Sequence, residues 1–463
     1  MINQLFYIDQ HGCAKNQVDA ELLTGCLKEI GWERTDSAEQ AKLIIVNSCG
    51  FIESAKLESI TAVIEAKKHY PDAKILLAGC LAERYCKSTN KPFMEEADAF
   101  LGNGNISKIK DIVQKLFEKS SGKKEVPVII EPQNGVCSGS RPELFSFPAS
   151  AYIKITEGCN NRCSFCAIPL IRGNLRSRPI NEIVEEIKQL ISTGVFEINL
   201  IGQDLASYGK DFKPAETESS QLALLLTEIA KIKADFWLRL LYIHPDNFNE
   251  DILPILQNDT RLLPYFDIPF QSGDDTIIQK MNRHGNHEQY IHLVEKIRRL
   301  LPDAVIRTTF LTGFPSETAE QFDNTIKFIE EIKPNWSGCF TYSKEDGTVA
   351  EKIRPVVPKT VAKKRKETIE RLQTQITENH LKKYIDKIFD IIIEEVISAK
   401  ENEDVGFFIG RTWFQAPEVD GAAVIQYEIT DYKQKTKVKP GNIIKAKITG
   451  TTNVDLQGFM IIS

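Results

Sequence analysis

The sequence predicts an α/β protein of three parts: an N-terminal parallel α/β domain, a central partial barrel of six strand-helix units, and a small C-terminal antiparallel β-barrel. Three observations predict this fold. The 463 residues are enough for about three domains. Short apolar runs alternate with helical patterns over residues 4–117, and the alternation resumes on a larger scale from residue 151. About the last 75 residues contain only short strand patterns separated by turn residues.

In the N-terminal part, each apolar run is followed by a helical pattern. We expect strands at 4–8, 42–47, 74–79 and 99–103, and helices near 17–30, 54–69 and 106–117. Such alternation is typical of a parallel sheet covered by helices on both faces. The stretch that follows is rich in Gly, Pro and Ser, which marks a linker. We therefore divide this half of the chain into a domain over 1–120 and a linker over 121–148.

The central part contains six apolar runs of strand length. They lie at 151–156, 197–202, 237–242, 265–270, 304–311 and 339–343. Six units are fewer than the eight of a closed barrel, so an open, partial barrel is predicted. An amphipathic helix over about 359–384 ends this domain, which we place at 149–385. The short strands after it predict a small barrel over 386–463.

Composition restricts the classes of function. The net charge is -6, which gives no general attraction for nucleic acid or anionic membrane. The N-terminus lacks a basic and apolar leader, and no apolar run approaches the length of a membrane span. We therefore expect a cytoplasmic protein with no membrane partner. In that compartment ten cysteines indicate metal binding or catalysis in preference to disulfides.

The stretch EGCNNRCSFCAIP (157–169) places Cys159, Cys163 and Cys166 within eight residues. A structural zinc site would need a fourth Cys or His nearby, and the following residues supply none. The cluster begins where a predicted strand ends, which is where open α/β folds bind ligands. Three thiolates on an iron-sulfur cubane leave one iron without a protein ligand, and that iron is free to bind a substrate or cofactor.

A second set of cysteines is scattered in sequence. Cys13, Cys49 and Cys80 each follow a predicted strand of the N-terminal domain, and each has an adjacent glycine. Because the carboxyl ends of parallel strands lie along one edge of a sheet, these thiols could share a cluster. The alternative is that they are buried small hydrophobic residues. The cysteines without such placement are interpreted as structural: Cys26, Cys86, Cys137 and Cys339.

The segment CNNRCSFC resembles the CxxxCxΦC motif of the radical S-adenosylmethionine enzymes, in which Φ is aromatic and is here Phe165. The resemblance implies a 4Fe-4S cluster on Cys159, Cys163 and Cys166. It implies that S-adenosylmethionine chelates the remaining iron and is cleaved reductively to a 5′-deoxyadenosyl radical. It also implies a partial (β/α)6 barrel, in agreement with the six units above. Since this chemistry requires no acid and base pair, we predict no catalytic residue beyond the cluster ligands.

Two three-cysteine sets followed by a small β-domain resemble the methylthiotransferases over nearly the whole chain. In that family an N-terminal 4Fe-4S cluster, here expected on Cys13, Cys49 and Cys80, carries the sulfur that is transferred. S-adenosylmethionine is both methyl donor and radical source, and the terminal barrel is of the TRAM type. The resemblance further implies a reductive electron donor and a sulfur donor as partners.

Several stretches resemble the branch of the family that modifies the β-carbon of an aspartate in small-subunit ribosomal protein uS12. They are GCAKNQVDAE (12–21), CAIPLIRG (166–173), QDLASYG (203–209), LTGFPSET (311–318) and RTWFQAPEVDG (411–421). The chain departs from that pattern at His11, and IPFQSGDD (268–275) resembles the branch that modifies adenosine in transfer RNA.

A charge count favours the protein substrate. Residues 388–463 carry eight Lys and Arg against eleven Asp and Glu, a net charge of -3. A module that grips transfer RNA should be basic, whereas an acidic one suits a basic ribosomal protein. The run KQKTKVK (433–439) is the local exception. Transfer RNA therefore remains the alternative substrate.

Polar residues at the ends of the central strands are candidates for binding S-adenosylmethionine. We select Gln203, Gln271 and Arg307, because the carboxyl edge of such a barrel holds its ligands. Each could equally be a satisfied strand-end group. Two other classes of function remain as alternatives: a non-catalytic iron-sulfur electron-transfer protein, and a zinc-scaffolded binding protein.

Overall fold

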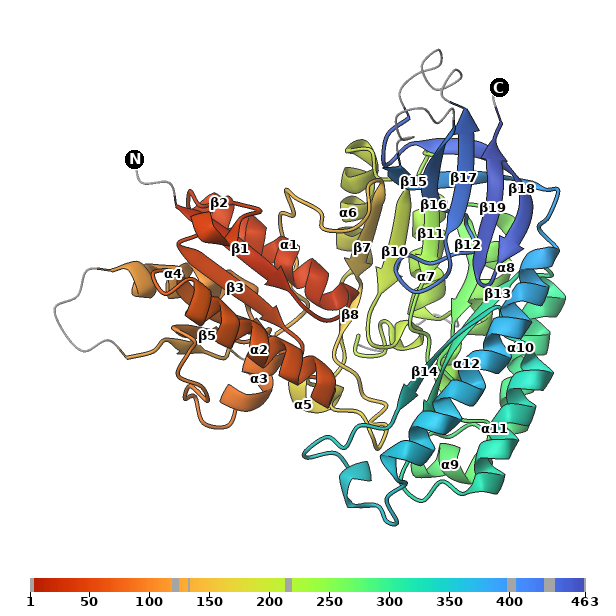
Figure 1. Ribbon diagram of the computed structural model, residues 1–463, viewed down its shortest axis with the longest axis horizontal. Helices are drawn as coiled ribbons and strands as arrows, with labels where there is room; N and C mark the ends of the chain where they lie inside the picture. Colours follow the sequence, from red (N-terminus) through yellow and green to blue (C-terminus); the bar gives the residue numbers. More distant parts are fainter. Residues whose placement is uncertain are drawn as a thin grey trace.

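The computed structural model describes residues 4–118, 125–131, 134–212, 219–397, 405–428 and 438–461. Figure 1 shows an N-terminal α/β unit at the left, a larger parallel-sheet unit in the centre and at the right, and a small barrel at the top. These are the three parts that the sequence predicts. Among the described helices, none combines the length and the apolar character that crossing a membrane requires.

The N-terminal unit is a six-stranded sheet in the order β2-β1-β3-β4-β5-β6, and every pairing in it is parallel. Its strands are β1 (Leu5–Gln10), β2 (Glu33–Arg34), β3 (Leu43–Ser48), β4 (Lys74–Gly79), β5 (Ala99–Leu101) and β6 (Val128–Ile129). Its helices are α1 (Ala14–Glu29), α2 (Glu53–His69), α3 (Cys80–Cys86) and α4 (Ile109–Phe117). The expected parallel sheet is confirmed.

Both faces of this sheet are buried, and alternation along β3 explains how. Leu43 and Ile45 pack in the cluster that includes residues of α1 and α4, whereas Ile44 and Val46 pack with residues of α2 and α3. A strand covered by helices on both faces needs such a continuous apolar run. The sequence did not reveal β6, which lies in the segment predicted as a linker and pairs with β5.

The central unit is an open sheet of six parallel strands in the order β14-β13-β12-β11-β10-β7, which confirms the partial barrel. Its strands are β7 (Ser150–Lys154), β10 (Glu197–Ile201), β11 (Trp237–Leu240), β12 (Leu262–Asp267), β13 (Val305–Thr312) and β14 (Trp336–Thr341). Its main helices are α6 (Ile180–Ser192), α7 (Gln221–Ala230), α8 (Leu253–Asn258), α9 (Asp275–Lys280), α10 (His287–Leu300), α11 (Ala319–Ile332) and α12 (Lys359–Lys382).

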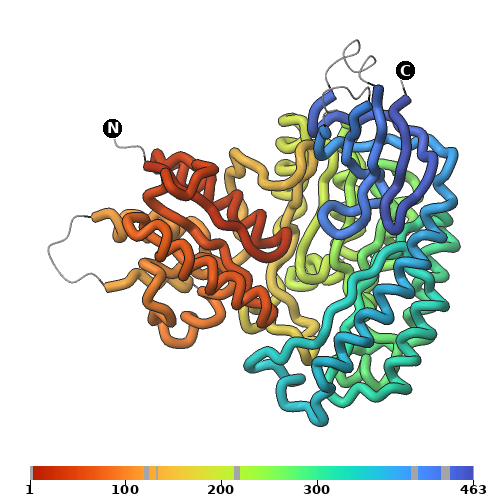
Figure 2. The backbone as a smooth tube through the Cα atoms, in the orientation of Figure 1, coloured from red at the N-terminus to blue at the C-terminus, as the bar shows by residue number. Residues whose placement is uncertain are grey.

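Two strands of this sheet are shifted from the predicted positions. The strand expected at 265–270 is β12, which begins at Leu262, ends at Asp267 and contains Pro264 where its register with β11 is irregular. The strand expected at 339–343 is β14, which begins at Trp336. Figure 2 shows α12 running along the side of the barrel away from the N-terminal unit, where it contacts β13 and β14.

The C-terminal unit is a closed barrel in the order β15-β16-β17-β19-β18. Its strands are β15 (Ile388–Ile397), β16 (Val405–Arg411), β17 (Ala423–Glu428), β18 (Ile443–Thr452) and β19 (Asp455–Met460). Four pairings are antiparallel, as expected, but β17 and β19 are parallel. The difference arises because β18 pairs with β15, so the hairpin strand β19 has to close the gap beside β17.

The small barrel is fixed to the central sheet by buried polar contacts. Glu197, the first residue of β10, accepts hydrogen bonds from Arg411 at 2.7 and 3.0 Å and from Arg239 at 2.9 Å. The indole of Trp336, the first residue of β14, donates to the carbonyl of Phe414 at 2.9 Å. The small barrel therefore covers the amino-terminal end of the central sheet, and leaves the carboxyl end to the cysteines.

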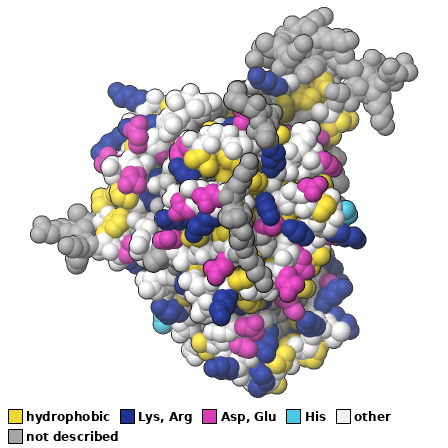
Figure 3. Space-filling view, turned by 90° about the vertical axis from the view of Figure 1, so that its left-hand side faces the viewer, with side chains coloured by type: hydrophobic (Ala, Val, Ile, Leu, Met, Phe, Trp, Pro, Cys, Tyr) yellow, Lys and Arg dark blue, Asp and Glu magenta, His cyan; other side chains and the backbone are white. Residues whose placement is uncertain are grey.

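Figure 3 shows the face of the molecule on the side of the N-terminal unit. Basic and acidic side chains are interspersed over the described part of this face. Phosphate backbones bind to continuous basic surface. Of the basic run predicted at 433–439, residues 433–437 lie outside the described residues.

Candidate metal centre

The three-cysteine motif forms a loop at the carboxyl end of β7. It lies between the short strand β8 (Thr156–Glu157) and the helical turn α5 (Ile168–Ile171). Gly158 begins the loop with φ +75°, and a Cβ there would lie 2.0 Å from the carbonyl oxygen of Asn174. Only glycine fits both the conformation and the space. The motif thus occupies the edge at which parallel α/β sheets bind ligands.

Backbone contacts hold this loop in shape. The N–H of Cys159 donates to the carbonyl of Gly173 at 3.1 Å, and the N–H of Cys166 donates to that of Cys163 at 3.0 Å. Ser164, between the last two cysteines, donates from its N–H to the carbonyl of Met281 at 2.9 Å. The aromatic residue of the motif, Phe165, packs against an apolar cluster of Ile277, Met281, Phe314 and Ala350.

The three cysteines of this loop are half-buried. Burial raises the pKa of the Cys159 thiol to about 11 and also raises that of Cys166. The Nε2 atom of His244 lies 3.6 Å from the sulfur of Cys163. Burial and the nearby charge of Arg283 lower the pKa of His244 to about 4, so its ring is neutral at pH 7. Without a bound cation the thiols of Cys159 and Cys166 are therefore protonated at pH 7, and a metal would have to displace their protons to bind the thiolates.

The second set lies at the carboxyl edge of adjacent strands, as the sequence predicts. Cys13 caps the start of α1 after β1, Cys49 follows β3, and Cys80 begins α3 directly after β4. Burial raises the pKa of the Cys49 thiol to about 12, and neighbouring Cys80 and Cys13 contribute to the increase. The side-chain amide of Asn103 donates to the sulfur of Cys80 at 3.6 Å. The structure therefore brings the three scattered thiols to one place.

Gly50, beside Cys49, allows this convergence. A Cβ at this position would lie 2.7 Å from the carbonyl oxygen of Cys80. Among the described residues, no three Cys, His, Asp or Glu side chains converge as the ligands of a single metal ion would. A four-iron cubane is wider than one ion, and thiolates are its usual ligands. The three thiols at each site are the kind of donor that such a cubane takes.

Arg172 joins the two cysteine sets, a role that sequence reasoning missed. It follows α5, six residues after Cys166, and its side chain is 2% exposed. Its guanidinium donates to the sulfur of Cys80 at 3.3 Å and to the carboxylate of Asp19 at 2.8 Å, and it also pairs with Glu157. The sequence shows this arginine only as part of CAIPLIRG, since its partners Cys80 and Asp19 in the N-terminal unit lie more than 90 residues away.

The polar residues selected at the strand ends have different surroundings. The Oε1 atom of Gln203, after β10, is buried and has no partner among the described residues. Gln271 has φ +70° and pairs through its backbone with β13. Arg307 is engaged in ion pairs with Asp267 at 3.0 Å and with Asp420 of the small barrel at 3.3 Å. Of the three, Gln203 has a side-chain oxygen that is available to a ligand.

Lys15 and Tyr242 lie where the N-terminal unit meets the carboxyl end of β11. The ammonium of Lys15 is 3.1 Å from the centroid of the Tyr242 ring. Burial lowers the pKa of this ammonium to about 8. Although desolvation alone would raise it, the positive charges of Lys15 and Arg172 hold the pKa of the Cys13 thiol below its ordinary value. The start of α1 is therefore an electropositive region.

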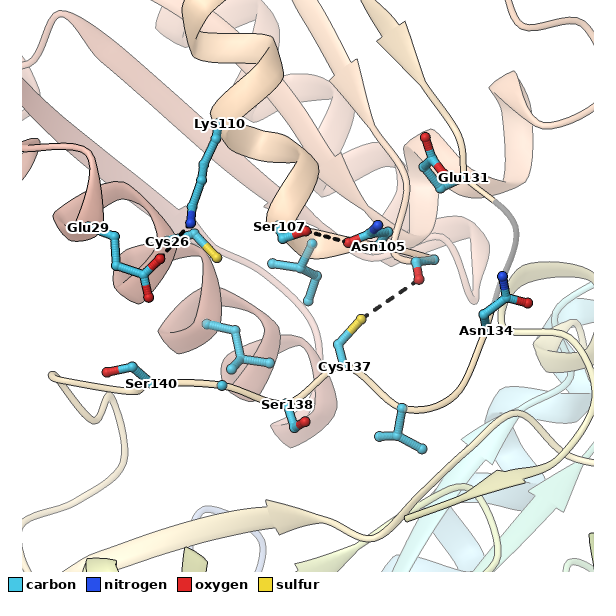
Figure 4. A pocket seen from close by; sticks show the side chains of 15 residues that line it. Cys26, Glu29, Asn105, Ser107, Lys110, Glu131, Asn134, Cys137, Ser138 and Ser140 are labelled. Atoms are coloured by element: carbon cyan, nitrogen blue, oxygen red, sulfur yellow. Dashed lines mark hydrogen bonds and ion pairs between the residues drawn. The ribbon is translucent and has the colours of Figure 1, made fainter. Parts of the chain in front are cut away.

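A separate cavity of about 440 Å³ lies at the other end of α1, between α4 and the linker (Figure 4). Cys26 and Cys137, both interpreted as structural, belong to its lining. The figure shows Cys26 beside the ion pair of Lys110 and Glu29, and the sulfur of Cys137 directed at the carbonyl of Gly104, 3.8 Å away. Burial raises the pKa of both thiols, so they are protonated at neutral pH.

Models of known families match three successive parts of the chain. The uncharacterized protein family UPF0004 matches residues 5–102, the radical SAM superfamily matches 153–329, and the TRAM domain matches 385–461. A protein of Treponema denticola named ribosomal protein uS12 methylthiotransferase RimO is 49% identical over 98% of this chain and 100% of its own length. The chain belongs to the RimO family of methylthiotransferases. The resemblance found in the sequence is confirmed.

Other relatives agree with this assignment to the RimO family. A protein of Aquifex aeolicus with the same name is 39% identical over 96% of this chain and 95% of its own. Among solved structures, the radical S-adenosylmethionine methyltransferase TsrM of Kitasatospora setae, with cobalamin and a [4Fe-4S] cluster bound, has a TM-score of 0.53. It is 13% identical over 75% of this chain and 77% of its own, a likeness of fold alone. The chain is thus a radical S-adenosylmethionine methylthiotransferase that uses a 4Fe-4S cluster.

Proposed function

We propose that this enzyme adds a methylthio group to the β-carbon of an aspartate in small-subunit ribosomal protein uS12. The observation that carries the proposal is the 49% identity to a protein named for that activity, over essentially the full length of both chains. The net charge of -3 on residues 388–463 supports a basic protein as substrate in preference to transfer RNA. Methylthiolation of adenosine in transfer RNA is the alternative.

Cys159, Cys163 and Cys166 are the proposed ligands of the radical-generating cluster. S-adenosylmethionine bound to the open iron would supply the 5′-deoxyadenosyl radical. The residues around the loop hold the three half-buried thiols at the barrel edge. Gln203 supports the proposal because its buried, unpartnered oxygen is available to accept a hydrogen bond from the amino group of that cofactor. Gln271 and Arg307 are kept as weaker candidates.

Cys13, Cys49 and Cys80 are the proposed ligands of a second 4Fe-4S cluster, which would carry the sulfur to be transferred. Arg172 supports this assignment, because it donates to the sulfur of Cys80 while it stands directly after the barrel motif. It ties the two sets together across the contact between the N-terminal unit and the barrel. A reductive electron donor and a sulfur donor complete the proposed partners, in the cytoplasm.

The test is an anaerobic reaction with reductant, sulfide and S-adenosylmethionine, in which small ribosomal subunits and bulk transfer RNA are offered in parallel. We expect mass spectrometry to find a methylthio group on an aspartate of uS12. Modified adenosine instead would overturn the substrate and keep the chemistry.

Cys163→Ala tests the ligand assignment. It should abolish formation of 5′-deoxyadenosine and leave iron on the N-terminal set. Cys339→Ala, which alters a buried cysteine of β14, is the matched control and should retain both clusters. Undiminished 5′-deoxyadenosine from Cys163→Ala would refute the assignment.

A further inference from the structure

Lys15 is a buried cation that lacks a carboxylate partner among the described residues. Its side chain belongs to a residue that is 8% exposed, and its closest recorded contact is the ring of Tyr242 at 3.1 Å. Lys154, which is also buried, contacts both Asp19 and Glu157, and the half-buried Lys56 contacts Glu345 at 2.8 Å. A charge removed from water is costly unless an opposite charge or hydrogen bonds compensate it.

The carboxylates nearest to Lys15 are already engaged by other cations. Asp267 influences Lys15 electrostatically but forms an ion pair with Arg307 at 3.0 Å. Asp19 is paired with both Lys154 and Arg172. The ammonium of Lys15 therefore lies against the ring of Tyr242 and forms no ion pair with a carboxylate among the described residues.

Lys15 also lies between the two cysteine sets. It stands two residues after Cys13, at the start of α1. Its contact residue Tyr242 stands two residues before His244, whose Nε2 is 3.6 Å from the sulfur of Cys163. One short segment after β11 thus contacts the lysine of one site and a cysteine of the other. Lys15 and Tyr242 therefore lie beside residues of both cysteine sets.

We infer that Lys15 binds the side-chain carboxylate of the substrate aspartate. The inference rests on the proposed function and names the group that selects its substrate. In aspartate the carboxylate is bonded directly to the β-carbon, so an ammonium that holds the carboxylate also fixes the reacting carbon. The ring of Tyr242 keeps the ammonium oriented in the meantime, as cation–π contacts do. An adenine base carries no charge and gains nothing from this lysine.

The charge of Lys15 has one competing use, which is to offset the thiolates of Cys13 and Cys80. The two uses differ in what they affect. A lysine that serves the cluster alters its spectrum and iron content whatever the substrate. A lysine that serves the substrate alters discrimination between a charged carboxylate and a neutral group of the same shape.

The experiment compares reconstituted wild-type enzyme with Lys15→Met and Lys15→Arg, using uS12 and a uS12 variant that carries asparagine in place of the modified aspartate. Binding of each form to each enzyme is measured anaerobically in the presence of S-adenosylmethionine. We expect wild type to bind the aspartate form more tightly, by roughly tenfold or more, as for loss of a hydrogen bond between charged groups. Lys15→Met should bind both forms equally, and Lys15→Arg should keep part of the preference.

Electron paramagnetic resonance spectra and iron content are the second measurement, and both should be unchanged in Lys15→Met. The matched control is Lys56→Met, which removes a paired lysine elsewhere on the N-terminal unit and should keep the wild-type preference. The inference is wrong if wild type shows no preference, if Lys15→Met retains it, or if only the spectra change. Failure of the proposed function would look different: wild type would not modify uS12 at all.

Discussion

Glu197→Gln is the sharpest test of how the small barrel is attached. The carboxylate of Glu197 is 0% exposed and accepts three hydrogen bonds from two guanidinium groups, those of Arg411 and Arg239. Removing the charge leaves two buried cations with one counter-ion fewer. Breaking a buried ion pair on one side costs about 3–5 kcal/mol. We expect Glu197→Gln to lower the free energy of unfolding of the protein by that amount.

Low pH also removes the charge of Glu197, by protonating its carboxylate. The two arginines outweigh burial and hold the pKa of Glu197 at about 2, below the value of about 4.3 for an unfolded chain. A carboxylate with a depressed pKa contributes stability above its unfolded pKa and loses it as pH falls through the folded one. Between about pH 4.3 and pH 2, wild type should therefore lose a contribution that Glu197→Gln never had.

The assay is denaturant unfolding followed by tryptophan fluorescence, since Trp336 and Trp413 both lie at this contact. Glu228→Gln is the control, because its pair with Lys231 is largely exposed and should be worth about 1 kcal/mol or less. If Glu197→Gln matches Glu228→Gln in stability at pH 7, and follows wild type as the pH is lowered, the reasoning is refuted.

Two further predictions concern the cysteine loop and the contact between units. Gly158→Ala forces a Cβ against a backbone carbonyl, so reconstituted protein should lose the iron of the barrel set; Gly194→Ala, which meets no atom within 4 Å, should not, and equal iron contents would contradict us. Glu345→Gln weakens contacts to Lys56 at 2.8 Å and Arg84 at 2.7 Å. Hydrogen exchange in α2 and α3 should then become faster, and an unchanged exchange rate would show that these ion pairs do not hold the units together.

The sequence predicts the secondary structure and the position of those residues, such as the cysteines at strand ends, that the secondary structure alone determines. The strand and helix patterns in the sequence predicted both parallel sheets. Because the carboxyl ends of parallel strands lie at one edge, the sequence alone also predicted that Cys13, Cys49 and Cys80 lie together. The sequence could not predict that Arg172 contacts Cys80 or that Lys15 contacts Tyr242, because these contacts depend on how the N-terminal unit packs against the central unit. Arg307 illustrates the limit: its position in a strand suggested a ligand contact, but a carboxylate from the small barrel lies beside it.

The parallel closure of the small barrel was missed for a related reason. Each strand was visible as an apolar run, but the order in which strands meet depends on the long connection between β17 and β18. The shift of β12 could not be predicted from its prolines, since Pro264 lies inside the strand and Pro269 lies just beyond it.

The strand β6 makes the segment predicted as a linker, residues 121–148, part of the N-terminal sheet. The N–H of Phe100 donates to the carbonyl of Pro127, just before β6, at 2.8 Å, and the N–H of Gly102 donates to the carbonyl of Ile129 at 2.9 Å. A fragment that stops at residue 118 would lack β6. The backbone amides and carbonyls of β5 would then be unpaired at the edge of the sheet, which favours aggregation. An excised N-terminal unit should therefore end at residue 131 and not at residue 118, so that β6 still pairs with β5.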